Sequence, residues 1–172
     1  MGDSLVFFLI HEGNMSIIYM DKLDKKALDM RLTTKSEYTL LALLYMARQG
    51  PDRYVKIDEI CSAYSIPRKY LELLLSVLRQ SRYIKTRRGS QGGYQLSRPA
   101  RAITVAEILR LMDGALAPTE SVSTYFYEQT PLSREPGLLA VFKEIRDYIA
   151  QRLENLTLAD LAQGAGGSEV AG

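Results

Sequence analysis

The 172-residue chain contains few of the side chains from which metal sites and many catalytic sites are built. It has one cysteine, Cys61, one histidine, His11, and no tryptophan. A single cysteine cannot form a disulfide within the chain, and ordinary zinc or iron–sulfur sites need more Cys and His ligands than these. Cys61 falls on the apolar side of a predicted short helix, where we expect an inert, buried thiol. The composition therefore predicts no enzyme activity and no metal site, and nothing in it requires an oxidising compartment, so a cytoplasmic location is expected.

The first residues show no pattern typical of a membrane segment. The apolar run at residues 5–10 is too short to cross a bilayer, follows Asp3 rather than a basic region, and precedes no small-residue cleavage site. Residues 1–29 could add a strand or a helix, or could be largely unstructured. We expect an N-terminal extension there, with neither a signal peptide nor a membrane anchor.

Charge is unevenly distributed along the chain, although the net charge is only +2. Residues 30–103 carry 14 Lys and Arg against 5 Asp and Glu, residues 104–172 carry 5 against 10, and residues 1–29 carry 3 against 5. A middle segment this basic indicates a polyanion as its partner. A solvated basic face with no partner is the alternative that charge alone leaves open.

Three helices are predicted in the basic segment. Thr34 and Glu37 match a capping box, in which the hydroxyl and the carboxylate each accept a backbone N–H, and the helix is predicted over Lys35–Gln49. Residues 57–64 predict a second, short helix. Pro67 suits the first position of a third helix, because its missing N–H would have no partner there.

The third helix has an apolar side and a basic side, and a hairpin follows it. Two short strands, Tyr83–Arg87 and Tyr94–Leu96, are joined by a glycine-rich turn at residues 88–93. The apolar stripe of the helix is made of leucines at helical spacing, and its charged residues fall largely off that stripe. The leucines are Leu71, Leu74, Leu75 and Leu78, and the charged residues are Arg68, Lys69, Glu72, Arg79 and Arg82.

This order of helix and basic hairpin predicts a winged helix-turn-helix that binds DNA. An α-helix fits the major groove, where side chains in its first turns reach base edges, while a basic hairpin can lie on phosphates or in the minor groove. Arg68, Lys69 and Tyr70 occupy the helix start, although Tyr70 could instead pack the helix onto its neighbour. A glycine-rich loop can also hold a nucleotide phosphate, but such a loop leads into a helix, whereas a strand follows here.

Beyond the hairpin, a helix, a long loop and a longer helix are predicted. Thr104 and Glu107 form a capping-box pattern, and their helix ends at Gly114. Residues 115–136 contain three prolines and several Ser and Thr, as is typical of a long loop. A helix then runs from residue 137 to about residue 155, with a stripe that we expect to pack against a second copy of the chain, because the basic domain has its own helices for a core. The stripe consists of Leu138, Phe142, Ile145, Ile149, Leu153 and Leu156.

Five short motifs occur in order along the chain. They are MRLT-K from Met30, YLE from Tyr70, RG--GGY from Arg88, ITVAEI from Ile103 with the DG that ends its helix, and L-NLTLADL from Leu153. Together they resemble the Rrf2 type of bacterial winged-helix transcriptional regulators, the relatives of IscR, NsrR and CymR. The resemblance runs from Met30 to about Ala162.

The resemblance implies a homodimeric DNA-binding repressor or activator with a mainly α fold and a small β-hairpin. The third helix would enter the major groove, and the hairpin would be the wing. The expected parts are an extension over 1–29, a winged helix-turn-helix domain over 30–114, an effector-type loop over 115–136, a dimerisation helix over 137–162 and a flexible tail over 163–172. The predicted DNA-binding residues are Lys35, Arg68, Lys69, Tyr70, Glu72, Arg79, Arg87, Arg88, Gly89, Ser90, Gln91, Gly92, Gly93 and Tyr94.

One departure from the family concerns its cofactor. Members that bind a [2Fe–2S] cluster have three cysteines between the ITVAEI helix and the dimerisation helix, and the corresponding loop here, residues 116–136, has none. We therefore expect a regulator without a cofactor, controlled by a protein partner, a small molecule or its own abundance. A cluster held by Cys61 with ligands of a dimer mate is one alternative. Another alternative is a winged-helix protein-interaction or sensor module that no longer binds DNA and makes its contact through Tyr125-Phe126-Tyr127.

Overall fold

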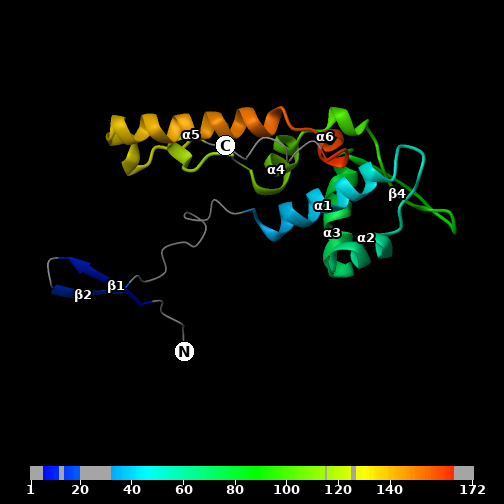
Figure 1. Ribbon diagram of the computed structural model, residues 1–172, viewed down its shortest axis with the longest axis horizontal. Helices are drawn as coiled ribbons and strands as arrows, with labels where there is room; N and C mark the ends of the chain where they lie inside the picture. Colours follow the sequence, from blue (N-terminus) through cyan, green and yellow to red (C-terminus); the bar gives the residue numbers. More distant parts are fainter. Residues whose placement is uncertain (1–5, 12–13, 20–31, 115, 125–126, 165–172) are drawn as a thin grey trace. The chain divides into compact units, whose positions relative to one another are not determined.

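The computed structural model describes residues 6–11, 14–19, 32–114, 116–124 and 127–164. It divides into two units, residues 1–31 and residues 32–172. All helices in the described ranges belong to the second unit (Figure 1). None of these helices is both long enough and apolar enough to cross a bilayer.

The first unit contains a β-hairpin. Strands β1 (Val6–His11) and β2 (Asn14–Tyr19) are antiparallel, and Val6 pairs with Tyr19. The sequence alone left a strand, a helix and an unstructured segment as alternatives here. The described part of this segment is two strands.

Helix α1 (Thr34–Arg48) begins close to its predicted start, but its cap is a different residue. Thr33, with φ −70° and ψ 154°, is the extended residue that precedes the helix, and its hydroxyl accepts the backbone N–H of Ser36 at 3.2 Å. The capping box predicted for Thr34 and Glu37 is therefore wrong: the cap is Thr33, one residue earlier, and it makes a single cap hydrogen bond instead of a capping box. Two adjacent threonines make both frames plausible in sequence, and only the backbone conformation separates them.

Helices α2 (Ile57–Tyr64) and α3 (Arg68–Gln80) are joined by a tight turn. Ser65 makes the turn with a left-handed backbone conformation, φ 54°. Pro67 was predicted to be the first helical residue of α3. It is instead the cap residue that precedes the helix. Its carbonyl oxygen accepts the backbone N–H groups of the third and fourth residues after it, at 3.1 and 3.0 Å.

The core of the second unit forms where α1, α2 and α3 meet. The predicted leucine stripe of α3 is buried, and Leu71 and Leu78 are inaccessible to solvent. Leu43 of α1 and Ile60 of α2 are equally buried and belong to the same cluster. Burial of each such side chain contributes about 1.5–3 kcal/mol, so this stripe holds α3 against the other helices and turns its opposite side outward.

The hairpin pairs strands β3 (Ile84–Arg87) and β4 (Gly93–Leu96). Val55, from the segment between α1 and α2, joins the hairpin through a single antiparallel β-bridge: its N–H donates to the carbonyl oxygen of Tyr94, and its carbonyl oxygen accepts the N–H of Tyr94, both at 2.8 Å. A Cβ atom added to Gly93 would lie 2.4 Å from the carbonyl oxygen of Val55, so the close approach of the two chains needs a glycine there. The hairpin is thereby fixed to the helical core.

The remaining helices bring the C-terminal part back to this core. Helix α4 (Val105–Asp113) has the predicted capping box, with hydrogen bonds of 2.9 and 3.2 Å between Thr104 and Glu107. The region predicted for dimerisation contains the long helix α5 (Pro136–Glu154) and, after it, the short helix α6 (Leu158–Ala162), which the Thr157 and Asp160 pattern also predicts. The buried Leu158 of α6 donates its N–H to the carbonyl of Ile103 at 3.0 Å and joins the main core. Short 3-10 helices are η1 (Ala100–Ala102), η2 (Glu120–Val122) and η3 (Pro131–Arg134).

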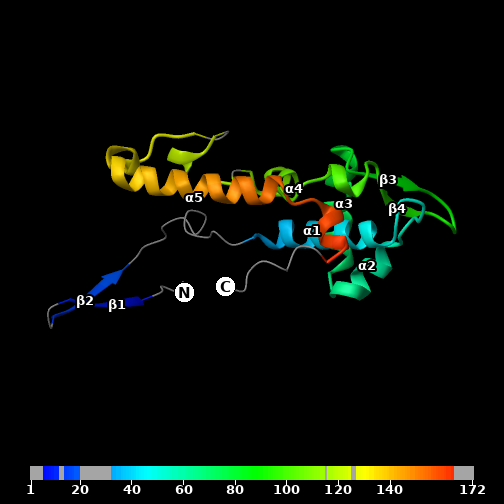
Figure 2. The ribbon, with the colours of Figure 1, turned by 45° about the horizontal axis from the view of Figure 1, so that its top comes forward.

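Within the second unit, the helices and the hairpin gather at one end. Both views place α1, α2, α3 and the hairpin together and show α5 running away from them (Figures 1 and 2). Helix α5 lies against α4, η2 and η3. The basic helix and hairpin are therefore presented at the end remote from the start of α5.

Candidate nucleic-acid interface

The exposed side of α3 carries most of the residues that the sequence predicts to bind DNA. Arg68, Lys69, Glu72 and Arg79 are all exposed, while the leucine stripe faces the core. Lys69 and Arg79 make no ion pair with any carboxylate of the described residues. Their charges therefore remain available for an anion.

Arg68, at the first position of α3, is held by two carboxylates. Its Nε lies 3.0 Å from Oε1 of Glu72, one turn along the helix, and its Nη1 donates to Asp58 of α2. Both hydrogen bonds raise the pKa of the guanidinium above its usual value, and the bond to Asp58 has the larger effect. The arrangement orients Arg68 at the helix start and offsets its charge. Asp58 was not predicted as part of this site, because it lies on another helix and no local pattern links it to Arg68.

Tyr70 is half-buried and packs against α1. Its ring lies edge-on to that of Tyr38, with centroids 6.0 Å apart. This is the packing role that the sequence left as the alternative for Tyr70. A contact between Tyr70 and a base stays a prediction.

The tip of the hairpin carries the predicted wing residues, and it needs glycine at one position for space and at another for its backbone conformation. A Cβ atom on Gly92 would lie 2.2 Å from the carbonyl oxygen of Arg87. Gly89 has φ +99°, a conformation that other residues rarely adopt. Arg88, Ser90 and Gln91 are exposed at the tip.

Arg87 contacts other parts of the wing. Its Nε and Nη2 donate to the carbonyl oxygen of Gln91 at 3.1 and 2.5 Å, and its guanidinium lies 4.3 Å from the ring centroid of Tyr54. Tyr54 belongs to the segment between α1 and α2 and was not predicted as part of the site. Arg87 thus shapes the tip and ties it to that segment, whereas Arg88 has no ion-pair partner among the described residues.

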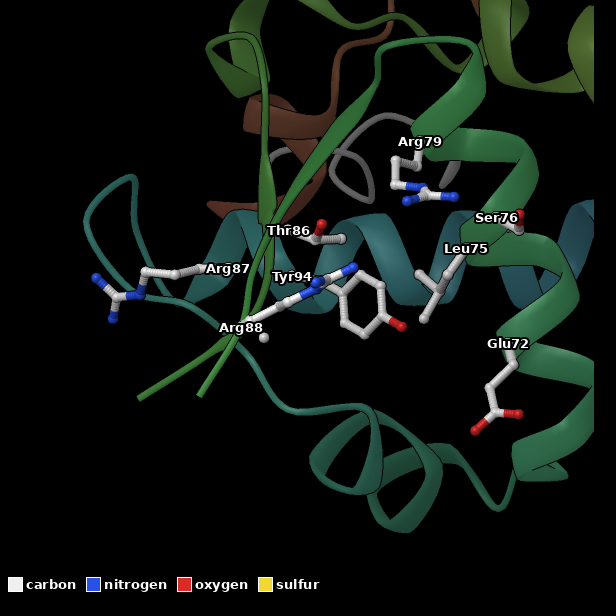
Figure 3. Close-up of a pocket in the computed structure, with 9 residues that line it drawn as sticks. Glu72, Leu75, Ser76, Arg79, Thr86, Arg87, Arg88 and Tyr94 are labelled. Carbon is white, nitrogen blue, oxygen red and sulfur yellow. The ribbon is translucent and has the colours of Figure 1, made fainter. Parts of the chain in front are cut away.

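A cleft of about 390 Å³ separates α3 from the hairpin (Figure 3). Arg79 and Ser76 line it from α3, and Arg88 and Tyr94 line it from the hairpin. Figure 3 shows the Arg88 side chain and the Tyr94 ring on the side toward α3, and Arg87 pointing away from it. Cations therefore border the cleft on both sides.

Lys35, the predicted phosphate contact at the start of α1, lies beside a carboxylate. Its Nζ is 3.8 Å from Oδ1 of Asp113, the last residue of α4, and that oxygen also accepts the hydroxyl of Thr33 at 2.6 Å. Ser36 donates to the other oxygen of Asp113. The contact joins the start of α1 to the end of α4 and offsets part of the charge of Lys35.

Cys61 lies on α2, half-buried beside the core. The pKa of its thiol is raised mainly by burial and then by the negative charge of Asp58. The thiol therefore stays protonated and weakly reactive near neutral pH. Among the residues that the structure describes, no group of three or more His, Cys, Asp and Glu side chains could hold a metal ion.

The predicted stripe of α5 divides between two faces. Phe142, Ile149 and Leu153 are half-buried on the side from which Arg146 donates to the carbonyl oxygen of Val122 at 2.7 Å. That side therefore packs against η2 of the same chain. Leu156 lies beyond the end of α5. The exposed face consists of Leu138 and Ile145 from the predicted stripe together with Val141 and Tyr148.

Three predicted features lie partly outside the described residues. Tyr125 and Phe126 of the proposed protein contact are not described, while Tyr127 is exposed. Of the predicted tail, only residues 163 and 164 are described. Met30 and Arg31, which open the first family motif, are also outside them.

Comparison with known proteins agrees with this architecture. Residues 32–164 match the Rrf2 family, described as iron-dependent transcriptional regulators. The Mycobacterium tuberculosis protein Rv1287, an HTH-type transcriptional regulator by name, is 35% identical over 137 residues, which cover 79% of this chain and 83% of that protein. The HTH-type transcriptional regulator CymR of Bacillus subtilis is 30% identical over 142 residues, covering 83% of this chain and 96% of CymR.

Solved structures show the same fold. The structure of CymR, described as the global cysteine regulator of B. subtilis, aligns with a TM-score of 0.65 and 29% identity, covering 79% of this chain and 98% of CymR. IscR of T. potens aligns with a TM-score of 0.63 and 27% identity, covering 85% of this chain and 96% of IscR. The predicted fold class, mainly α with a small hairpin in a winged helix-turn-helix, is confirmed.

The donor set of this chain does not fit the iron named in the family's description. A cluster needs several thiolates or imidazoles, and the chain has one cysteine and one histidine. Cys61 lies on α2 within the helical domain and keeps its proton, and residues 116–136 supply no further cysteine.

The match over residues 32–164, the identity to the named relatives and the shared fold show that the chain belongs to the Rrf2 family of transcriptional regulators and is a DNA-binding regulator.

Proposed function

We propose that this protein acts as a homodimer that recognises a specific DNA sequence with α3 in the major groove and the β3–β4 hairpin on the phosphates. One observation carries the proposal: exposed cations without carboxylate partners border the cleft between α3 and the hairpin on both sides. Arg79 borders the cleft from the helix and Arg88 borders it from the hairpin, and Lys69 is exposed in the first turn of the same helix. Cations on two elements fit a duplex, whose groove is flanked by two lines of phosphates.

The individual residues suit different roles in this arrangement. Arg68 and Lys69 lie in the first turn of α3, from which side chains reach base edges, and Asp58 and Glu72 orient Arg68 for that contact. Arg79, Arg82 and Arg88 suit phosphates, which carry no sequence information. Arg87, bound to Gln91 and stacked on Tyr54, supports the hairpin from within.

A second copy would complete the molecule along the exposed face of α5. Tyr148 is 71% exposed and Leu138 52% exposed on this face, and α5 buries no residue within its own chain. A symmetric dimer would present two copies of α3 to half-sites about 34–36 Å apart on one side of the duplex. The contact would thus be made by Leu138, Val141, Ile145 and Tyr148, with Phe142, Ile149 and Leu153 supporting it from the other side.

The regulator would work without a cofactor, enzyme activity or membrane contact, in the cytoplasm. The poor donor set supports the absence of a cluster, and the family supports a regulator in place of an enzyme. The signal would then reach the protein as a protein partner, a small molecule or a change in abundance. The loop predicted to be of effector type contains η2 and η3 and joins α4 to α5.

The proposal is tested by measuring the affinity for duplexes selected from a random-sequence library at several salt concentrations. The wild-type protein should select one sequence, with affinity falling steeply as salt rises. Arg68→Ala with Lys69→Ala should remove the preference for that sequence, whereas Arg88→Ala should weaken all sequences alike and lower the salt slope by about one.

Arg134→Ala, which removes an exposed cation from η3, serves as the control and should leave both quantities unchanged. Selection of no sequence, or binding that ignores all three substitutions in α3 and the hairpin, would contradict the proposal. Sedimentation of the same samples measures whether the bound species contains two chains.

A further inference from the structure

Helix α3 leaves two large apolar side chains exposed on its outward side. Leu73 is 64% exposed and Val77 is 38% exposed. They lie one turn apart and therefore share a face. A single exposed leucine is ordinary in proteins, but an aliphatic pair on the helix that carries the basic site forms a surface that can be recognised.

The position of this pair relative to the charged residues follows from helix geometry. Leu73 lies four residues after Lys69, so the two side chains are neighbours on one face. It lies about 100° around the helix from Glu72, which lines the cleft toward the hairpin (Figure 3). Leu73 therefore stands near the middle of the outward side of α3, between the Lys69 cation and the side that packs on α1.

We propose that Leu73 and Val77 read thymine by contacting its C5-methyl group in the major groove. The thymine methyl is the apolar feature that the major groove of unmodified DNA presents, and an aliphatic side chain detects it by excluding water from it. This inference rests on the proposed function, in which α3 enters that groove.

Charge decides between DNA and a protein as the occupant of this face. Lys69 next to Leu73 has no carboxylate partner among the described residues, and Arg79 follows on the same helix. A protein partner would have to bury or neutralise these cations, whereas a duplex supplies phosphates on both sides of the groove. The combination of an aliphatic pair with flanking cations fits duplex DNA that carries thymine.

Because Leu73 and Val77 are aliphatic, α3 cannot recognise adenine or guanine by hydrogen bonds at this position. Glutamine can bond to N6 and N7 of adenine, and arginine can bond to O6 and N7 of guanine, but leucine can do neither. Leu73 consequently discriminates only by shape and by the methyl group. A preference for thymine over cytosine or uracil is the expected result.

The test uses the duplex selected by the wild-type protein and replaces its thymines one at a time by uracil, which removes only the methyl group. At the contacted position, affinity should fall about fourfold, the factor expected for one carbon taken out of a buried contact. The same replacement should have no effect on the Leu73→Ala protein at that position. Leu32→Ala, which truncates another exposed leucine of the second unit, is the control and should retain the wild-type response.

A second variant tests the direction of the change. Leu73→Gln introduces an amide that can accept a hydrogen bond from N6 of adenine and donate one to N7. Selection with this protein should therefore replace the thymine at the contacted position by adenine, or relax the preference there. Leu73 is exposed, so neither variant should alter the thermal unfolding curve.

The inference fails if uracil is tolerated at every position by a wild-type protein that still selects a sequence, since DNA reading by α3 would then stand without the methyl contact. Selection of no sequence by the wild-type protein would overturn the proposed function together with the inference. Loss of thymine discrimination in both Leu73→Ala and Leu32→Ala would also count against it.

Discussion

Helices α3 and α5 both carry regular apolar stripes, yet the two stripes have different partners. In α3 the four leucines are buried by α1, α2 and the rest of the core. In α5, which is longer, no residue is buried, and half of the apolar residues lie on a face that nothing in the described chain covers. Helical spacing therefore predicts that a helix has a contact face, but the partner of that face is decided by the rest of the chain or by a second molecule.

The largest effect is expected from a truncation in the stripe of α3. Leu75 is 1% exposed, and Leu75→Ala should lower the free energy of unfolding by about 2–5 kcal/mol, because it removes buried carbons and leaves a cavity. Chemical unfolding at fixed protein concentration measures this change. Leu73→Ala, the same truncation on the exposed side of the same helix, should change it by less than about 0.5 kcal/mol. Equal losses for both variants would show that α3 is not packed as described.

The α3 stripe, the hairpin and the order of the elements could be predicted from the sequence, because each depends on residues close together in the chain. Leucine spacing identified the buried side of α3, and the glycines at 89, 92 and 93 identified the turn of the hairpin. Element boundaries were less accurate. Thr33 instead of Thr34 caps α1, since two neighbouring threonines offer the same chemistry.

Contacts between distant residues could not be predicted in this way. Asp113 accepts hydrogen bonds at the start of α1 although 77 residues separate it from Ser36, and no periodic pattern links the two. Asp58 beside Arg68 and Tyr54 beneath Arg87 are similar cases. On α5, spacing alone did not tell which residues of the predicted stripe η2 would partly cover, nor that Val141 and Tyr148 would be exposed beside Leu138 and Ile145.

A truncation on the uncovered face of α5 should act on association and leave the fold of the chain intact. Tyr148→Ala removes the most exposed large side chain of this face and should raise the dissociation constant of the proposed dimer at least about 30-fold, as for a central interface tyrosine. Analytical ultracentrifugation over a range of concentrations measures it. Tyr127→Ala truncates a similarly exposed tyrosine off α5 and should leave the constant unchanged. An unchanged constant for Tyr148→Ala would mean that this face is not the contact between two copies.

The opposite face of α5 should respond locally. Arg146 donates to the carbonyl oxygen of Val122 at 2.7 Å, so Arg146→Ala should lower the local stability of η2 by about 1–3 kcal/mol. Hydrogen exchange of the amides at residues 120–123 should become faster, while exchange in α3 stays the same. Arg152→Ala on the exposed part of the same helix is the matched control and should leave η2 unaffected. Faster exchange along the whole chain would indicate global destabilisation in place of a local contact.

The smallest effect is expected where an exposed carboxylate offsets a cation at the start of α3. Asp58→Asn removes the negative charge that is bound to Arg68, so affinity for random-sequence DNA should rise by about twofold to threefold and the ratio of specific to non-specific affinity should fall, because Arg68 loses the partner that orients it. Competition titrations with random-sequence duplex at constant salt measure both quantities. Glu144→Gln removes the same charge from an exposed position on α5 and should alter neither. If both substitutions raised the affinity equally, only the net charge of the protein would matter. An increase confined to Asp58→Asn would show that the charge beside Arg68, at the start of α3, controls the affinity.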